Sequence, residues 1–278
     1  MTALKKAGVM GWPVAHSLSP ALHEFWLKQY GIAGSYEALP VPPDKLAEAL
    51  RMLKMRGFAG CNLTIPHKEA ALPLMTRLDE AARRIGAVNT VVVDPDGTLS
   101  GSNTDGFGFI ENLRAAAPDF NPRRSPAVVL GAGGAARAIL CALTDAGAPE
   151  IRLVNRSSER ARTLANSLDG PIRIGSWEQR AGLLAGAGLL VNATSLGMTG
   201  QPSLDIALEN LPTTAMVNDI VYAPVETPLL RQARMRGLHA VDGLGMLLHQ
   251  ARPGFKAWFG IEPRVTPELR RAVLAARP

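Results

Sequence analysis

The glycines of GAGGAA are the residues whose types and spacing point most directly to a chemistry. Gly131, Gly133 and Gly134 follow the apolar run AVVL, and Ala136 stands where the usual dinucleotide fingerprint has its third glycine. Glycines here permit a tight turn and let the backbone approach a pyrophosphate, whose charge then lies at the amino terminus of the next helix. Strand, glycine turn, helix and second strand follow in order, so we expect a bound dinucleotide that carries a hydride. A βα turn that is merely rich in small residues is the alternative.

The residues after the second strand indicate which dinucleotide is bound. The strand IRLV is followed by Asn155 and Arg156, where an NAD enzyme usually offers an acidic side chain to the ribose 2′-hydroxyl. Arg156 and Arg160, one helical turn apart, instead offer guanidinium groups to a 2′-phosphate that carries about −1.5 to −2 charges at neutral pH. The pattern predicts NADP, against the alternative of two solvated arginines at the start of a helix.

Polar clusters before the glycine turn suggest a second site. HSLSP presents Ser17 and Ser19 at the entry to a helix, where hydroxyls and backbone N–H groups can bind a carboxylate; a simple helix cap by Ser19 is the alternative. NLTIPHK contains Thr64 and places Lys68 at the start of a helix, where the lysine charge opposes the helix dipole. That small local cost favours a functional role for Lys68 over a solvated one.

Two further clusters are ambiguous when each is taken alone. Asn89 lies in AVNT beside the strand VVV, and Asp105 lies in GSNTDG between Thr104 and Gly106. Asparagine, aspartate and threonine also stabilise turns through their own side chains. Either cluster by itself therefore favours turn chemistry.

The elements that must position these residues fall into two patterns. In the front half the sequence predicts a mixed α/β domain. Its expected first helix has Ser19 as the N-cap, Pro20 at the first helical position and Gly31 beyond its end. The other expected elements are a strand and turn over residues 5–14, strands over residues 35–41 and 58–66, helices over residues 43–57 and 67–75, and a hairpin over residues 87–105.

In the back half, apolar strands alternate with helices, which is typical of a doubly wound parallel sheet. Strands are expected over residues 127–130, 151–154, 188–194, 215–221 and 238–241, and closing helices over residues 245–260 and 266–277. The proline- and arginine-rich NPRRSP, residues 121–126, is typical of an interdomain connection. We therefore predict a substrate domain of residues 1–115 and 243–278, to which the closing helices return, and a Rossmann domain of residues 116–242.

Taken together, these clusters resemble the shikimate dehydrogenase family. SLSP, NLTIPHK, AVNT, SNTDG, GAGGAAR, NR, VNATSLGM, DIVYAP and MLLHQARPGF follow one another in order over nearly the whole chain. The resemblance implies NADP-dependent interconversion of shikimate and 3-dehydroshikimate, a step in making chorismate and the aromatic amino acids.

The resemblance also implies a role for particular residues. Ser17, Ser19 and Tyr222 would hold the substrate carboxylate. The residues that would bind its ring hydroxyls are Thr64, Lys68, Asn89, Asp105 and Gln250. The residues that would surround the phosphates and adenosine end of the cofactor are Gly131, Gly133, Gly134, Ala135, Asn155, Arg156 and Arg160, and those near its nicotinamide are Thr194, Met198 and Gly243.

Lys68 and Asp105 are the expected catalytic pair of such an enzyme. Oxidation of a secondary alcohol requires a proton acceptor within hydrogen-bond reach of the hydroxyl oxygen. Lys68 would exchange that proton while Asp105 orients the ammonium and the hydroxyl. An aspartate partner raises the pKa of a lysine and burial lowers it, so two modes remain open: proton transfer by Lys68, or stabilisation of the developing alkoxide by its ammonium.

Composition limits the other classes of function. Hydrophobic residues make up 47% and charged residues 19%, as in ordinary globular proteins. The net charge of +6 is spread along the chain without interleaved aromatics, which argues against nucleic-acid binding. The apolar run from Ala181 is too short to span a bilayer, so we expect a cytoplasmic protein. Cys61, Cys141 and the scattered histidines, among them His67, match no metal spacing, so no metal is expected.

Two alternative functions remain. Quinate or an amino analogue of shikimate would be recognised by much the same residues, because a single contact in such a pocket decides between them. A regulatory protein that kept the fold and lost activity is the other alternative. Lys68 and Asp105 are both present, which argues against the second. Whether the protein is a monomer or a homodimer is left open.

Overall fold

The chain forms two compact units, seen here in a computed structural model that describes residues 4–276. Unit 1 ends its first segment at Thr104 and resumes at Leu247, and unit 2 spans Asp105–Met246. The closing helices thus return to the first unit, and both units are α/β, as the sequence predicted. The predicted domain limits, 1–115 with 243–278 and 116–242, remain a proposal.

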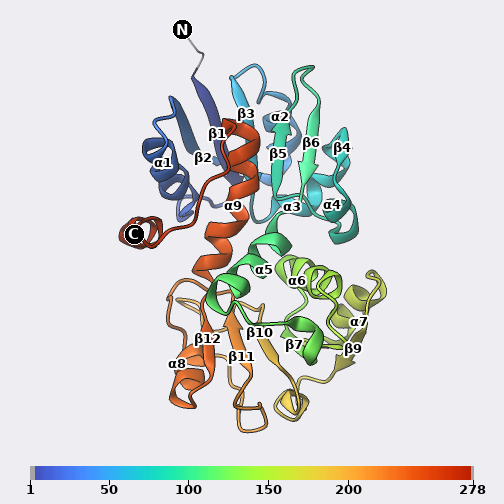
Figure 1. Cartoon of the computed structure of the whole chain (residues 1–278). Coiled ribbons are helices and arrows are strands. Elements are labelled where there is room, and N and C mark those ends of the chain that lie inside the picture. Colours follow the sequence, from blue (N-terminus) through green and yellow to red (C-terminus); the bar gives the residue numbers. More distant parts are fainter. Residues whose placement is uncertain (1–3, 277–278) are drawn as a thin grey trace. The chain divides into compact units, whose positions relative to one another are not determined.

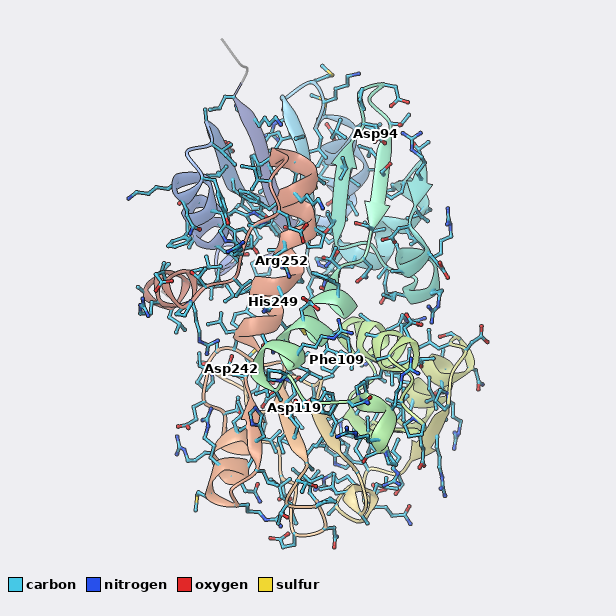
Figure 2. All side chains as sticks on the ribbon, in the orientation of Figure 1. Asp94, Phe109, Asp119, Asp242, His249 and Arg252 are labelled. Carbon is cyan, nitrogen blue, oxygen red and sulfur yellow. The ribbon has the colours of Figure 1, made fainter. Side chains whose placement is uncertain are left out.

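Unit 1 is built on a six-stranded mixed sheet in the order β2-β1-β3-β5-β6-β4. Its strands are β1 (Lys5–Gly11), β2 (Gly34–Pro40), β3 (Phe58–Leu63), β4 (Arg77–Leu78), β5 (Thr90–Val93) and β6 (Leu99–Ser102). Strand β1 pairs in parallel with β2 and β3, whereas β5 is antiparallel to both β3 and β6. In the hairpin of β5 and β6, Asp94 (labelled in Figure 2) follows β5, and it accepts a hydrogen bond of 2.7 Å from Arg77.

Helices on both sides of this sheet complete unit 1 (Figure 1). They are α1 (Ser19–Gln29), α2 (Leu46–Arg51), α3 (His67–Ala70), α4 (Glu80–Ile85), α10 (Pro267–Ala275) and, from Leu247 onward, α9 (Leu244–Phe259). The indole N–H of Trp258 on α9 donates to the Val91 carbonyl of β5 at 3.0 Å. Gly60 on β3 has a positive φ of +157°, and a Cβ there would clash with both of these groups. A glycine at position 60 therefore lets α9 pack against the sheet.

Unit 2 contains a parallel six-stranded sheet in the order β12-β11-β10-β7-β8-β9. Its strands are β7 (Ala127–Leu130), β8 (Ile151–Val154), β9 (Ile172–Gly175), β10 (Leu189–Asn192), β11 (Met216–Asp219) and β12 (His239–Val241). The helices are α5 (Asp105–Ala116), α6 (Gly134–Asp145), α7 (Ser158–Asn166) and α8 (Pro228–Met235). This is the doubly wound fold that the alternating pattern predicted.

The apolar strands of unit 2 have hydrophobic cores on both faces. Ala127 and Val129 face one core, which includes Phe109 of α5 (labelled in Figure 2). Val128 and Leu130 face the opposite core. Successive side chains of a strand point to opposite faces, so a strand covered on both sides is apolar throughout.

Some local predictions were wrong. Ser19 is the first residue of α1, and the N-cap is Leu18, so the predicted cap is displaced by one residue. The helix expected over residues 43–57 is shorter: a 3₁₀ turn at Pro43–Lys45 leads into α2, which ends at Arg51. Helix α4 and strand β9 lie in segments for which no element was predicted. Within residues 4–276, no helix combines the length and the apolar character needed to cross a membrane.

Candidate active site

A tight glycine turn joins β7 to α6 in unit 2. Gly131 has a φ of +113°, and a Cβ there would lie 2.8 Å from the Ala193 carbonyl oxygen, so the fold of unit 2 itself requires this glycine. At Gly133 and Gly134, in contrast, an added Cβ would meet no atom of another part of the described chain within 4 Å. Packing therefore does not explain these two glycines. The open space at their Cα atoms fits the close approach of a pyrophosphate.

The amino terminus of α6 fits the same ligand. Gly133 is the N-cap in an extended conformation, and among the described residues no side chain caps the helix. The first N–H groups of this 12-residue helix are thus available for an anion. Ala136 is fully buried and packs in the core, which explains a small side chain in place of the third glycine.

A pocket of about 510 Å³ lies beside this turn, at the carboxyl end of β8. Asn155, Arg156 and Thr194 of the predicted cofactor site line it. The Asn155 amide donates to the Ser157 carbonyl at 2.9 Å, which holds the start of α7. Arg160 lies on the first turn of α7, outside the pocket lining, and its backbone N–H donates to the Ser157 hydroxyl at 3.3 Å.

Trp177 and Arg180 are among the lining residues of this pocket that sequence reasoning missed. The Arg180 guanidinium lies 5.0 Å from the centre of the Trp177 indole, and its Nε donates to the Asp205 carbonyl at 2.8 Å. The pocket therefore offers a flat aromatic surface and two guanidinium groups, which suits an adenosine phosphate. The only sequence signal for these two residues was a tryptophan three residues before an arginine. That spacing belongs to none of the motifs considered above.

A buried carboxylate organises the neighbouring edge of the same sheet, where β10 and β11 end. Asp219 is fully buried and accepts three hydrogen bonds: from the Asn192 amide at 2.9 Å, the Val221 N–H at 3.0 Å and the Thr227 hydroxyl at 2.7 Å. Burial raises the pKa of Asp219 to about 6, against the lowering effect of these bonds. Sequence reasoning did not single out Asp219, because its partners come from separate segments.

Asn192 extends this arrangement to the predicted nicotinamide side. Its Oδ1 accepts from the Thr194 N–H at 3.1 Å and from the Thr194 hydroxyl at 2.7 Å. Met198 follows in the same loop and is 39% exposed. Tyr222 is half-buried in the loop that follows Asp219. At Gly243 an added Cβ would clash with the Ile220 carbonyl, so unit 2 itself requires that glycine.

Unit 1 brings several of the predicted substrate residues together around Asn89. The Asn89 Oδ1 accepts from the Thr104 N–H at 2.9 Å, and its Nδ2 donates to the Gln250 Oε1 at 3.4 Å. The Thr104 hydroxyl donates to the Gln250 carbonyl at 2.8 Å. The amides of Asn89 and Gln250, from segments far apart in the sequence, therefore share one polar cluster.

The other predicted residues of unit 1 lie at the ends of β1 and β3. Ser19 is buried, and its N–H donates to the Ser17 hydroxyl at 3.3 Å. The Thr64 N–H donates to the Met10 carbonyl at 2.9 Å. Lys68 lies on α3, and its carbonyl accepts from the Val88 N–H at 2.8 Å, next to Asn89. This bond joins the lysine's helix to the segment that carries the asparagine.

The two residues expected to be catalytic lie in different units. Lys68 belongs to unit 1, and Asp105 is the first residue of α5 in unit 2, where it is 7% exposed. His67, next to Lys68, is buried with its Nε2 2.8 Å from the Val41 carbonyl oxygen. That bond gives His67 a structural role.

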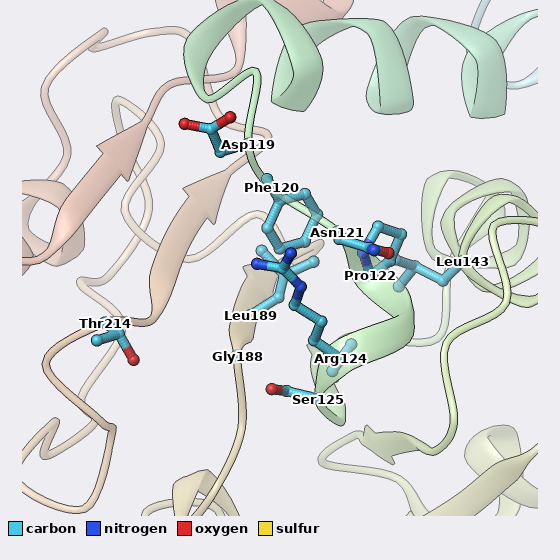
Figure 3. Close-up of a pocket in the computed structure, with 11 residues that line it drawn as sticks. Asp119, Phe120, Asn121, Pro122, Arg124, Ser125, Leu143, Gly188, Leu189 and Thr214 are labelled. Atoms are coloured by element: carbon cyan, nitrogen blue, oxygen red, sulfur yellow. The ribbon is translucent and has the colours of Figure 1, made fainter.

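A second hollow in unit 2 lies at the opposite, amino end of β7 and β10 (Figure 3). It has a volume of about 220 Å³, and Phe120, Arg124 and Leu189 are among its lining residues. Ligands of doubly wound sheets bind outside the carboxyl ends of the strands. The hollow in Figure 3 is therefore not the expected cofactor site.

Two family models match the chain. Residues 9–91 match the shikimate dehydrogenase substrate binding domain, and residues 115–199 match the shikimate / quinate 5-dehydrogenase model. The first match covers the strands and helices around Asn89, and the second covers the glycine turn and the Arg156 pocket.

The similarity to individual proteins extends over the full length. The chain is 60% identical to the shikimate dehydrogenase (NADP(+)) of Paramagnetospirillum magneticum, over 97% of this chain and 98% of that protein. It is 58% identical to the enzyme of the same name from Rhodospirillum rubrum, over 96% of each chain. A crystal structure of the Thermus thermophilus shikimate 5-dehydrogenase in complex with NADP(H) and shikimate superposes with a TM-score of 0.87 at 41% identity, covering 99% of this chain and 100% of that one.

Proposed function

Because this chain belongs to the shikimate dehydrogenase family, we infer that it is an NADP-dependent oxidoreductase that interconverts 3-dehydroshikimate and shikimate. The reaction serves the biosynthesis of chorismate and the aromatic amino acids. The observation that carries the proposal is the arginine-bearing pocket beside two glycines that packing does not require. We place the enzyme in the cytoplasm, as a monomer or a homodimer.

NADP would be held by the carboxyl edge of the unit 2 sheet. The glycine turn and the N–H groups of α6 bind its pyrophosphate, and Arg156 pairs with its 2′-phosphate. Arg156 follows β8, and Thr194 and Met198 follow β10, so the adenosine half and the nicotinamide half would lie over different strands of the sheet. When bound, the cofactor supplies the acceptor or donor of the hydride. The proposed cofactor residues are Gly131, Gly133, Gly134, Ala135, Asn155, Arg156, Arg160, Thr194, Met198 and Gly243.

The substrate would be held by hydroxyls, amides and one ammonium group. Ser17 and Ser19 bind its carboxylate together with the Tyr222 phenol. The ring hydroxyls are bound by Thr64, Lys68, Asn89, Asp105 and Gln250. A site of this kind rejects analogues that lack a hydroxyl, because buried polar groups would be left unpaired.

Lys68 and Asp105 would handle the proton. Asp105 accepts a hydrogen bond from the substrate hydroxyl or the Lys68 ammonium and so orients both. The Lys68 amine takes the hydroxyl proton during oxidation and returns it during reduction of the ketone. Where the ammonium stays charged, it instead stabilises the negative charge that develops on the oxygen.

The test is an assay of the full chain that follows reduced-cofactor absorbance with shikimate or quinate and with NAD or NADP, in all four pairings. We expect the highest kcat/KM with shikimate and NADP. Faster turnover of quinate would change the substrate assignment. The same assay with aminoshikimate tests the remaining analogue. Absence of turnover in every pairing, together with tight shikimate binding, would favour a regulatory protein instead.

A further inference from the structure

A buried chain of neutral hydrogen-bonding side chains runs through unit 1 behind the proposed substrate residues. Its members are Tyr36, Asn62, Thr90 and Asn89, each with at most 5% of its surface exposed. None of the four is a charged residue, and three of them lie on different strands of the sheet. Groups that bond in series inside a protein polarise one another, so the order of donors and acceptors along the chain matters.

Two backbone groups set the direction of this chain. At one end, the Asn62 Nδ2 donates to the Asn89 carbonyl at 3.1 Å, and a carbonyl oxygen accepts and never donates. The Asn62 Oδ1 therefore faces the Tyr36 hydroxyl, which must donate to it, at 2.6 Å.

At the other end, the Asn89 Oδ1 accepts from the Thr104 N–H at 2.9 Å, and a backbone N–H donates and never accepts. This oxygen also accepts from the Thr90 hydroxyl at 2.9 Å, and Thr90 in turn accepts from the Asn62 Nδ2 at 3.1 Å. Every proton thus points the same way, from Tyr36 through Asn62 and Thr90 to Asn89. The Nδ2 of Asn89 is left on the side of Gln250.

The phenol of Tyr36 is the first donor of the chain. Burial raises the pKa of Tyr36 well above its ordinary value, and nearby Cys61 raises it further. The phenol therefore stays protonated and donates to Asn62. The Tyr36 ring stacks on His23 at 3.9 Å with an interplanar angle of 3°. Burial lowers the pKa of His23 to about 3, so this stacking partner is neutral.

We propose that Tyr36 and Thr90 are positioning residues that orient the Asn89 amide for the ring hydroxyls of the substrate. The inference rests on the proposed function, which assigns Asn89 to the substrate. Because the chain has one direction, the Tyr36 phenol fixes the Asn62 amide, and the Asn62 amide fixes the Thr90 hydroxyl that donates to Asn89. Tyr36 and Thr90 act through Asn89 and do not touch the substrate themselves.

The first test replaces the Thr90 hydroxyl in the full-length protein. Thr90→Val should weaken shikimate binding about tenfold in titration calorimetry and leave NADP affinity within twofold, because the Asn89 amide loses one of the donors that orient it. Thr90→Ser keeps the hydroxyl and should restore most of the affinity, whereas a role in packing alone would not be rescued by a smaller side chain. Thr76→Val, at an exposed threonine of unit 1, is the matched control.

The second test measures the coupling itself. Shikimate dissociation constants of Tyr36→Phe, Thr90→Val and the double variant should be non-additive by about fivefold, since side chains in one hydrogen-bonded network interact energetically. Tyr36→Phe keeps the ring that stacks on His23 and removes only the hydroxyl that donates to Asn62. Tyr36→Phe alone also tests the inference if Thr90→Val does not fold, and it should raise KM for shikimate more than it lowers kcat.

Several results would overturn the inference. They are an additive cycle of Tyr36→Phe and Thr90→Val, an unchanged KM for shikimate in Tyr36→Phe, or a shikimate affinity of Thr90→Val within twofold of the wild type. A wild-type protein without shikimate turnover contradicts the proposed function instead. The two failures are therefore distinguishable by the wild-type assay.

Discussion

The two units organise their polar groups in opposite ways. In unit 1, Tyr36, Asn62 and Thr90 form a neutral chain in which the interior members both donate and accept. In unit 2, the carboxylate of Asp219 receives three donors, from Asn192, Val221 and Thr227, and gives none. Both arrangements are buried.

The difference shows where pH should act on this molecule. A neutral chain costs little to bury when every member is bonded, and protonation does not change it between acidic and neutral pH. A buried carboxylate costs more, and its proton changes the number of bonds that it can accept. We therefore expect the orientation of the substrate amides to be insensitive to pH and the cofactor-side loops to respond to it.

The largest effect should be the pH-dependent stability that Asp219 contributes. Its pKa is about 6 in the folded protein, above the ordinary 3.8, so between these values the folded state holds a proton that the unfolded state has lost. Wild-type stability should therefore fall by roughly 3 kcal/mol as the pH rises from about 4 to 7, and Asp219→Asn should lack this fall. Urea unfolding of both proteins at pH 4, 5.5 and 7 measures the difference.

The matched control for Asp219 is Asp205→Asn. The Asp205 side chain is 99% exposed. The difference in free energy of unfolding between Asp205→Asn and the wild type should therefore not change with pH. If Asp219→Asn differs from the wild type by the same free energy of unfolding at pH 4 and at pH 7, unit 2 is not the pH-sensitive unit.

The next largest effect should be on catalysis and should come from Lys68 of α3, in the proposed substrate site of unit 1. Lys68→Ala should lower kcat by about a hundredfold with NADP affinity unchanged, because the proton loses its acceptor or the alkoxide its counter-charge. Stopped-flow turnover and NADP titration measure the two quantities. Lys54→Ala serves as the control, since the Lys54 ammonium bonds to the Pro95 carbonyl, at the hairpin. Turnover of Lys68→Ala near that of the wild type would exclude a chemical role.

Cofactor selectivity should depend on the Arg156 pocket of unit 2. Arg156→Asp should weaken NADP binding about tenfold and shift the preference toward NAD, because the 2′-phosphate loses a charge-assisted partner and meets a carboxylate. Fluorescence titration with both cofactors tests this. Arg162→Asp makes the same change of charge on α7, outside the pocket lining, so an equal loss of NADP affinity in both variants would mean that only the overall electrostatic field matters.

Much of this site could be predicted from the sequence because its signals are local. The glycine turn, the strand before it and Arg156 stand within one short segment, and backbone geometry there follows from residue type. Strand β9 was missed because its side chains are half-buried or exposed at the sheet edge, so no apolar run marks it. The Ser19 cap was displaced by one residue, which is within the ordinary uncertainty of helix ends.

The rest of the site could not be predicted, because it depends on contacts between distant segments. Asp219 meets Asn192 and Thr227 only once strands β10 and β11 pair and α8 packs beside them. Tyr36 and Asn62 likewise come from strands β2 and β3, which lie on either side of β1, and they are 26 residues apart in sequence. The orientation of an amide is set by such partners, and no single motif contains them.

The smallest effect, and the sharpest test of the comparison, concerns the stability of Tyr36→Phe. Loss of the phenol leaves the Asn62 Oδ1 without its donor, so the variant should lose about 1 to 2 kcal/mol. Burial raises the pKa of Tyr36 above its ordinary value of 10.0, so the phenol stays protonated in both states from pH 4 to 8 and the loss should be constant over that range. Urea unfolding under the conditions used for Asp219→Asn gives a direct comparison. A loss that changes by more than about 1 kcal/mol across the range would mean that a titrating group is coupled to the chain, and unit 1 would no longer be the pH-insensitive half of the site.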